Sequence, residues 1–129
     1  MKTFVEFITE GASPLNKLIE AIKKDDERMV LNIVDKNEDV VNMLTKEGAT
    51  PLMFATARNE KSNIMKILIE AGADIERKSK NSVTALMIAV LYGNQKNVDM
   101  LVKAGAKKVG TYTNGDSIKD VAKLTNIRL

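Results

Sequence analysis

Hydrophobic residues along this chain recur at the spacing of short amphipathic helices. Ser13-Pro14 reads as a helix start, because Ser is a favoured N-cap and the missing N–H of Pro needs no partner at the first helical position. Apolar residues then follow at helical intervals, at Leu15, Leu18, Ile19 and Ile22. A second apolar stripe lies within residues 27–36, at Met29, Val30, Ile33 and Val34. The pattern predicts two short helices joined by a tight turn.

The same pair of helices is predicted twice more along the chain. The further pairs lie at residues 50–58 with 62–71 and at 84–92 with 95–104, and a closing helix with a weak capping box lies at 117–124. Thr50 is repeated as Thr84, and the motif at residues 67–73 is repeated at 100–106. The two intervals are nearly the same. A fixed period of about 33 residues indicates a stacked array, in which each unit buries its apolar face against its neighbours.

The residues that carry this period resemble the ankyrin repeat family. Thr50-Pro51-Leu52 matches the family's helix-opening phrase, Leu68-Ile69-Glu70-Ala71-Gly72-Ala73-Asp74 is close to its helix-ending phrase, and weaker copies flank both. The resemblance implies an all-α ankyrin-repeat solenoid of stacked helix–turn–helix units, with three fuller repeats and partial capping ends. The expected boundaries are an N-terminal capping helix at 1–12, an array at 13–124 with repeats near 13–45, 46–78, 79–111 and a partial 112–124, and a C-terminal tail at 125–129.

The chain departs from the family pattern at identifiable positions. It has no histidine, so the place of the signature His is taken by Ile19, Met53, Met87 and Asp120. Asn37 stands where the first repeat should have its helix-ending glycine, and one extra residue is present within 59–62. Gly72 and Gly105 remain at the positions of left-handed helix caps.

Both ends of a stack need a cover for their apolar face. Phe4, Phe7 and Ile8 fall on one side of a short N-terminal helix that could cover the first repeat. At the other end we expect the closing helix to bury Ile118, Val121 and Leu124, and the polar tail 125–128 to be free to fray.

Composition agrees with thin stacked helices. Aromatic residues make up 4% of the chain and there is no Trp, so the core has to be built from aliphatic residues, Met and Ala. The first ten residues are interrupted by Glu6 and Glu10, so they contain no apolar stretch of signal-peptide or membrane-span length, and a cytoplasmic location is the default expectation. Net charge runs from −3 over residues 1–47 to +4 over 103–129, a gradient that would steer an acidic partner to the C-terminal repeats unless it only reflects solvated lysine-rich helix faces.

Catalytic chemistry is poorly supported. Without His or Cys the chain has no ordinary triad or zinc site, and it has no phosphate-binding glycine loop, so we expect no enzyme activity, no cofactor and no metal. The acidic run Asp25-Asp26-Glu27 fits the start of a helix, and Asn114-Gly115 fits the tip of a tight turn rather than a calcium loop. Too few aromatics are present for a nucleic-acid stacking platform, so neither nucleic acid nor a small-molecule substrate is the expected partner.

The resemblance implies protein binding through the concave face, which turns and first helices form together. Mapped onto this chain, the expected partner-binding residues are Lys46, Glu47, Ala49, Ala57, Arg58, Lys80, Asn81, Val83, Leu91, Tyr92, Thr113, Asn114 and Asp116. Leu91 has two interpretations: an exposed apolar contact for a partner, or a residue packed on the neighbouring first helix.

Two classes of function remain open at this point. The first is a monomeric module that binds another protein, and the second is a structural unit that stacks end to end or dimerises through a poorly capped end. Light scattering at dilute concentration distinguishes them.

Overall fold

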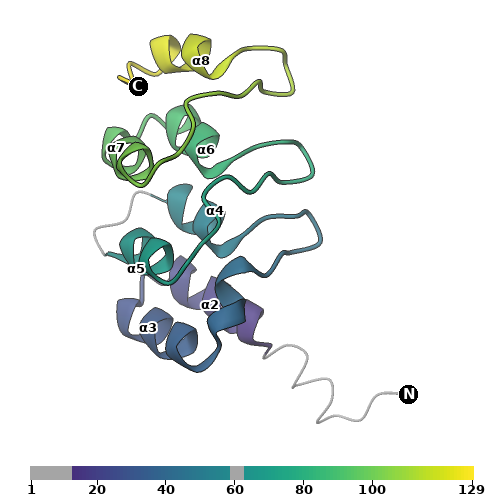
Figure 1. The fold of residues 1–129 in the computed structure, drawn as a ribbon, viewed down its shortest axis with the longest axis vertical. Coiled ribbons are helices and arrows are strands. Elements are labelled where there is room, and N and C mark those ends of the chain that lie inside the picture. The colour runs from purple at the N-terminus through teal and green to yellow at the C-terminus, as the bar shows by residue number, and fades with distance from the viewer. Residues whose placement is uncertain (1–12, 59–62) are drawn as a thin grey trace.

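A computed structural model describes residues 13–58 and 63–129 of the chain. The described residues form a stack of helix pairs along one axis, with the N-terminal pair at one end and a single helix at the other (Figure 1). The elements in chain order are α2 (Pro14–Lys23), α3 (Glu27–Lys36), the 3-10 helix η1 (Glu38–Asn42), α4 (Pro51–Thr56), α5 (Ile64–Glu70), α6 (Ala85–Leu91), α7 (Gln95–Lys103) and α8 (Ile118–Leu124). The predicted all-α solenoid is confirmed.

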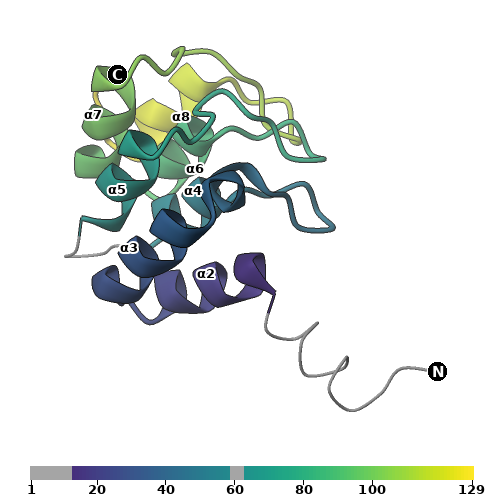
Figure 2. The same cartoon turned by 60° about the horizontal axis from the view of Figure 1, so that its bottom comes forward.

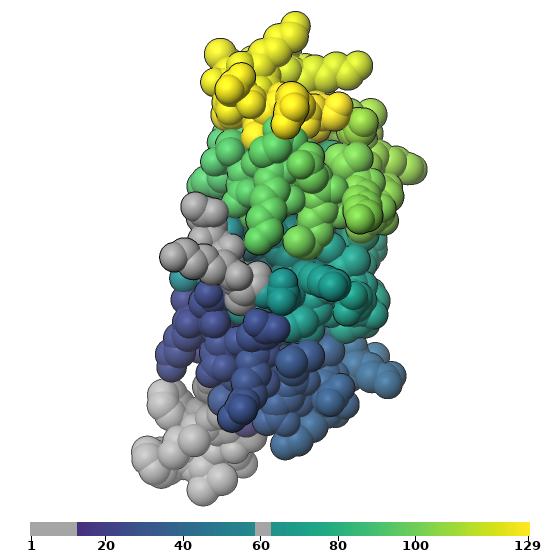
Figure 3. All heavy atoms as spheres, turned by 90° about the vertical axis from the view of Figure 1, so that its left-hand side faces the viewer, coloured from purple at the N-terminus to yellow at the C-terminus, as the bar shows by residue number. Residues whose placement is uncertain are grey.

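The helices form two layers. One layer is a row formed by the first helix of each repeat, α2, α4 and α6, followed by α8. Each helix of this row contacts the next along the stack (Figure 1). We call these four the inner helices, and we call α3, α5 and α7 the outer helices. The space-filling view of Figure 3 shows the segments following one another in chain order along the long axis. This order is the nearest-neighbour packing that defines a repeat stack.

Three extended turns project from the same side of the stack (Figures 1 and 2). We call them finger 1 (residues 43–49), finger 2 (76–83) and finger 3 (109–116). The backbones of the first two close in the same way, because Thr45 N–H donates to the Ala49 carbonyl and Ser79 N–H to the Val83 carbonyl, at 3.0 and 2.9 Å. Fingers 1 and 2 are joined directly by the Lys80 N–H, which donates to the Glu47 carbonyl at 3.1 Å.

The core is the apolar layer between successive helices. It is built from leucine, isoleucine, valine, methionine and alanine, as the composition predicts. Its largest fully buried side chains include Leu18, Leu52, Leu86 and Ile118, one from each inner helix. Met53 and Met87, which occupy the place of the signature histidine, are also buried. Core filling is therefore their structural role.

Local capping sets where the inner helices begin. The side chains of Thr50 and Thr84 accept hydrogen bonds from the backbone N–H of Met53 and Met87, at 3.2 and 3.3 Å. Ser117 and Asp120 form a complete capping box at α8, as predicted from the sequence.

The repeats end differently along the stack. Gly72 and Gly105 have φ of 98° and 101°, the left-handed caps that the sequence predicts. Asn37, in the corresponding place of the first repeat, has φ of −141°, and the chain continues into η1 instead of a left-handed turn.

Side chains also tie neighbouring repeats together. Asn42 accepts a hydrogen bond from the Asp74 N–H at 2.8 Å, and Glu76, in the matching place of the next repeat, accepts one from the Lys107 N–H at 2.8 Å. The buried Asn97 of α7 donates to the carbonyls of Thr56 and Arg58 at the end of α4, at 3.2 and 3.4 Å. None of these links was predicted, because the pairs they join lie about one repeat or more apart in the chain.

The C-terminal end corrects two expectations. Leu124, expected in the core, is 80% exposed, whereas Ile127 of the tail is buried. Asn126 adopts a left-handed conformation with φ of 59°, which turns the chain back so that Ile127 N–H reaches the Ala122 carbonyl at 2.8 Å. Gln95 then holds the tail by accepting from the N–H of Arg128 and donating to its carbonyl. The tail is therefore docked against the stack.

The expected N-terminal capping helix at 1–12 and the inserted residue within 59–62 lie outside the described residues.

Candidate functional site

The predicted binding residues lie on the fingers and at the ends of the inner helices. Ala57 and Arg58 follow α4, Leu91 is the last residue of α6, and Tyr92 is its C-cap. Leu91 is 52% and Tyr92 63% exposed. Leu91 is thus not sequestered in the stack, and half of its surface is available for contact.

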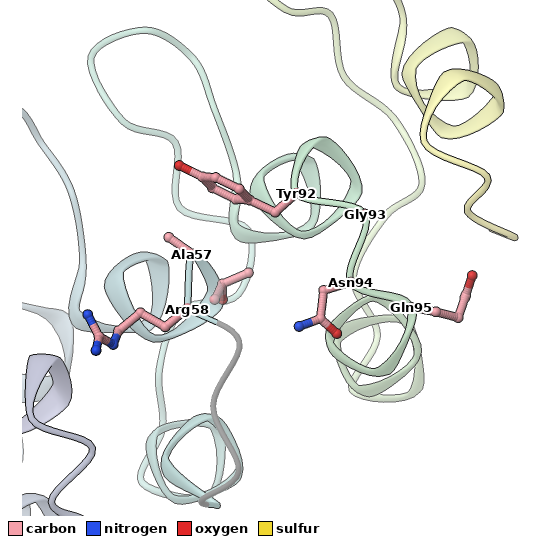
Figure 4. Close-up of a pocket in the computed structure, with 7 residues that line it drawn as sticks. Ala57, Arg58, Tyr92, Gly93, Asn94 and Gln95 are labelled. Atoms are coloured by element: carbon pink, nitrogen blue, oxygen red, sulfur yellow. The ribbon is translucent and has the colours of Figure 1, made fainter.

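Arg58 and Tyr92 stand in matching places one repeat apart. Figure 4 shows both side chains extending to the same side from the ends of α4 and α6. They line one surface pocket of about 290 Å³, here called the α4–α6 pocket. The other lining residues are Thr56, Ala57, Gly93, Asn94 and Gln95. The sequence did not point to Gly93, Asn94 and Gln95, although they follow Tyr92 directly in the turn.

Finger 1 presents charge at its tip. Lys46 and Glu47 are exposed, and Ala49 is half-buried. The pKa of the Glu47 carboxyl is lowered, chiefly by a hydrogen bond from its own backbone N–H and one from Thr45, with smaller help from Lys80 and Lys46. The Lys80 ammonium and the Glu47 carboxylate therefore form part of one surface across fingers 1 and 2.

Finger 2 combines exposed and structural positions. Lys80 and Asn81 are exposed at its tip, and Ser82 has a positive φ of 60°. Val83 is half-buried, and its N–H donates to the Ser79 hydroxyl at 3.3 Å. Val83 thus helps to close the turn, as Ala49 does in finger 1 through the Thr45 hydroxyl.

Finger 3 is held by its own side chains. Thr113 and Asn114 are exposed, while Asp116 is half-buried. The Asn114 amide donates to the Asp116 carboxylate at 2.9 Å and accepts from the Asp116 N–H at 3.0 Å. These bonds explain the Asn-Gly sequence as a turn tip, and they occupy the polar groups that a calcium ion would need.

Tyr112 anchors the base of finger 3. Its hydroxyl donates to the Met87 carbonyl at 2.6 Å, and burial raises the pKa of Tyr112 to about 12. The phenol is therefore neutral at physiological pH and serves as a structural donor.

The outer layer has a pocket of its own. It lies between α5 and α7, has a volume of about 460 Å³ and is here called the outer pocket. Its lining residues are Lys66, Ile69, Glu70, Asp99, Met100, Lys103 and Ala104. Because Lys66 and Asp99 lie here, substitutions at these two positions test the outer face as a rival binding surface.

The described residues offer no metal-binding cluster. Within residues 13–58 and 63–129, no group of three or more acidic, His or Cys side chains could hold a metal ion. Asp26 caps α3 by accepting from the Met29 N–H at 3.0 Å, which accounts for its place in the acidic run.

No helix in the described part of the chain has the length and apolar character needed to cross a membrane.

The fold and the repeated caps define a helical repeat solenoid, and comparison with known proteins specifies which kind. The family model for ankyrin repeats, in three copies, matches residues 18–111. The chain belongs to the ankyrin repeat family.

Several relatives share this region. Ankyrin repeat and SAM domain-containing protein 6 of Rattus norvegicus is 32% identical over 110 residues, which cover 84% of this chain and 12% of that protein. Phosphocholine transferase AnkX of Legionella pneumophila is 33% identical over 120 residues, which cover 92% of this chain and 12% of the transferase. The chain thus spans only a small part of these relatives, and what they share is the repeat region.

Proposed function

We propose that this chain is a non-enzymatic interaction module that binds another protein through the finger face. We define the finger face as the three fingers together with the exposed ends of α4 and α6. Ankyrin repeats are generally protein-interaction modules, and an extended surface of this kind is what a repeat stack offers to a partner. A cytoplasmic location remains the expectation from the sequence.

The observation that supports this choice of face most is the α4–α6 pocket. It is bordered by Arg58 and by Tyr92, which is 63% exposed, and Leu91 lies beside it in the chain. Tyr and Arg are the residue types that most often dominate interface energies, and an exposed Leu next to them adds apolar area. Leu91 and Tyr92 both keep more than half of their surface exposed at this place.

The experiment is capture of a partner by the immobilised chain and its Ala variants. Replacing Arg58 or Tyr92 with Ala should weaken binding by about 1–2 kcal/mol or more, as for interface anchors of these types. Stability should change by no more than about 0.5 kcal/mol, because both positions are at the surface. Isothermal titration with the captured protein and chemical denaturation measure the two quantities.

Lys66→Ala and Asp99→Ala are the matched controls, because both residues line the outer pocket. If these two changes abolish capture while Arg58→Ala and Tyr92→Ala do not, the partner uses the outer face and the proposed site is wrong.

Self-association is the second candidate. The last helix exposes Lys119, Asp120 and Lys123 as well as Leu124, so charges surround the large apolar side chain of Leu124 at that end. This favours a monomer. A concentration-dependent rise in mass by light scattering, removed by Leu124→Lys, would instead support stacking of copies through α8.

A further inference from the structure

Finger 2 and the residues 107–108 that lead into finger 3 are strongly basic. Residues 76–83 and 107–116 carry five cationic side chains and two carboxylates, Glu76 and Asp116. All five cations are exposed: Arg77, Lys78, Lys80, Lys107 and Lys108. Finger 1, in contrast, carries one lysine and one glutamate. The positive charge on the finger side of the stack therefore lies on finger 2 and at residues 107–108.

Most of this positive charge has no partner within the described residues. Arg77, Lys78, Lys107 and Lys108 form no ion pair with any residue in 13–58 or 63–129, whereas Lys80 is close enough to Glu47 to lower its pKa. The nearby carboxylate of Glu76 is already used, because it accepts the Lys107 backbone N–H at 2.8 Å. Among the described residues, no carboxylate pairs with these four cations, which leaves their charge to attract an external anion.

A pocket opens between fingers 2 and 3. This finger pocket has a volume of about 320 Å³, and Glu76 and Lys78 line it from finger 2. Val109 and Gly110 line it from finger 3, and Met87 of α6 contributes its buried side chain. Val109 is 66% exposed. The exposed side chain of Val109 therefore provides apolar contact area among the lysines.

We propose that fingers 2 and 3 bind an acidic polypeptide segment of the partner. One apolar side chain of the segment enters the finger pocket against Val109, and carboxylates on either side of it contact Lys78, Lys107 and Lys108. The inference rests on the proposed function, since it names the chemical class of the protein partner. Complementary charge of this kind speeds encounter and selects among partners, and the apolar contact adds affinity that salt does not screen.

The surface favours a polypeptide over a nucleic acid. Single-stranded nucleic acids bind through aromatic side chains on which bases stack. Tyr112 is the one aromatic residue of fingers 2 and 3, and its hydroxyl is bound to the Met87 carbonyl. An aliphatic side chain between carboxylates fits the pocket and the lysines together.

The test uses the whole chain and a short synthetic peptide of Asp and Glu residues around a single leucine. Backbone amide shifts in NMR detect weak binding and locate it. We expect peptide-dependent shifts at residues 76–82 and 107–111. Shifts spread evenly over the lysines of the whole chain, or no shifts at all, would overturn the inference.

Charge-matched variants locate the effect. Lys78→Glu combined with Lys108→Glu should weaken peptide binding by about tenfold or more, because each reversal replaces an attraction with a repulsion. Lys119→Glu combined with Lys123→Glu changes the net charge equally on α8, outside the fingers, and should weaken binding far less. Equal losses from the two pairs would show attraction to net charge alone and refute the proposed site.

The peptide itself supplies the second control. Changing its leucine to glutamine keeps the charge and removes the apolar side chain, and this should reduce binding several-fold if the finger pocket is used. A single-stranded oligonucleotide, added at the same concentration of negative charge, is a competitor for the surface. If it displaces the leucine peptide as effectively as the free peptide does, the surface binds nucleic acid and the proposal is refuted.

This inference and the proposed function fail in different ways. If the captured partner depends on Arg58 and Tyr92 but the acidic peptide produces no shifts at fingers 2 and 3, only the chemical class of the partner is wrong. If the peptide binds as expected but capture of a folded protein is unaffected by the Arg58 and Tyr92 variants, the proposed use of the whole finger face is wrong. Fingers 2 and 3 then remain as a peptide-binding surface.

Discussion

The inner helices α4 and α6 are alike where they are buried and different where they are exposed. The same five positions are buried in each, and three carry the same residue: Leu52 and Leu86, Met53 and Met87, and Ala55 and Ala89. Their exposed ends diverge, with Ala57 against Leu91 and Arg58 against Tyr92. The matched residues are those that the stack needs, because each packs on a neighbouring helix. The divergent residues are available for recognising a partner.

The outer helices, in contrast, differ at a buried position. Ile64 of α5 and Asn97 of α7 occupy matching places in successive repeats, and both are buried. Asn97 replaces apolar packing with hydrogen bonds to the end of α4, so α7 is tied to the preceding repeat through polar atoms. Polar and apolar residues can therefore serve the same place in the stack.

The largest expected loss of stability comes from disrupting the buried face that α4 and α6 have in common. Ala89 has no exposed surface, and its helix packs between α4 and α8. Ala89→Leu should therefore overpack the stack and lower the free energy of unfolding by about 1–3 kcal/mol. Urea denaturation measures this, and the loss should be concentrated in the C-terminal repeats because contacts are between neighbours. Ala57→Leu, at the exposed end of α4, is the control and should stay within about 0.5 kcal/mol.

Substitutions at Asn97 test how much its hydrogen bonds to the end of α4 contribute to stability. Asn97→Ala leaves the carbonyls of Thr56 and Arg58 without their donor, which should cost about 1–2 kcal/mol. Asn97→Leu restores the volume but not the hydrogen bonds, so it should remain less stable than the original chain. Full stability of Asn97→Leu would mean that the bonds to α4 contribute nothing.

The two threonine caps should respond alike. Thr50 and Thr84 make the same bond at nearly the same length, so replacing either with Ala should cost about 1 kcal/mol. Midpoints of thermal or urea unfolding provide the comparison. A clear difference between the two variants would show that the repeats are less equivalent than their buried faces indicate.

The smallest effect is expected from Tyr112, which supports α6 and has no counterpart on α4. Because burial raises the pKa of Tyr112 to about 12, above the usual value of 10.0, the folded state holds the phenolic proton more firmly than the unfolded state. This contribution is complete below pH 10 and is lost as pH rises toward 12. Tyr112→Phe should be less stable at neutral pH, and the difference from the original chain, measured by urea unfolding at a series of pH values, should shrink over this alkaline range.

Features that depend on nearby residues were predictable from the sequence. The helix starts at Thr50, Thr84 and Ser117, the capping box with Asp120 and the left-handed glycines all involve partners within a few positions in the chain. The candidate binding residues were chosen only from their position within the repeat. This position correctly placed Arg58 and Tyr92 on one side of the stack. Their role in binding stays a prediction.

The burial of residues at the C-terminal end was not predictable, because it depends on which segment packs over them. Helical spacing places Leu124 near the apolar face of α8, but α8 is the last helix of the described residues, and Leu124 is exposed. Ile127 takes a core position instead, because Asn126 adopts a left-handed turn that directs the tail back onto the stack. Asn is one of the few residues that accept this conformation, so Asn126 was the available signal.

The sequence by itself determined the repeat unit, its period and the inward face of each helix, because these follow from local spacing and capping. Only the tertiary structure decided which polar atoms join one repeat to the next, where pockets open between helices and fingers, and how the C-terminal end is closed. Those features bring together groups about one repeat apart in the chain. Their geometry depends on how each helix pair rests on its neighbour, which no single repeat encodes.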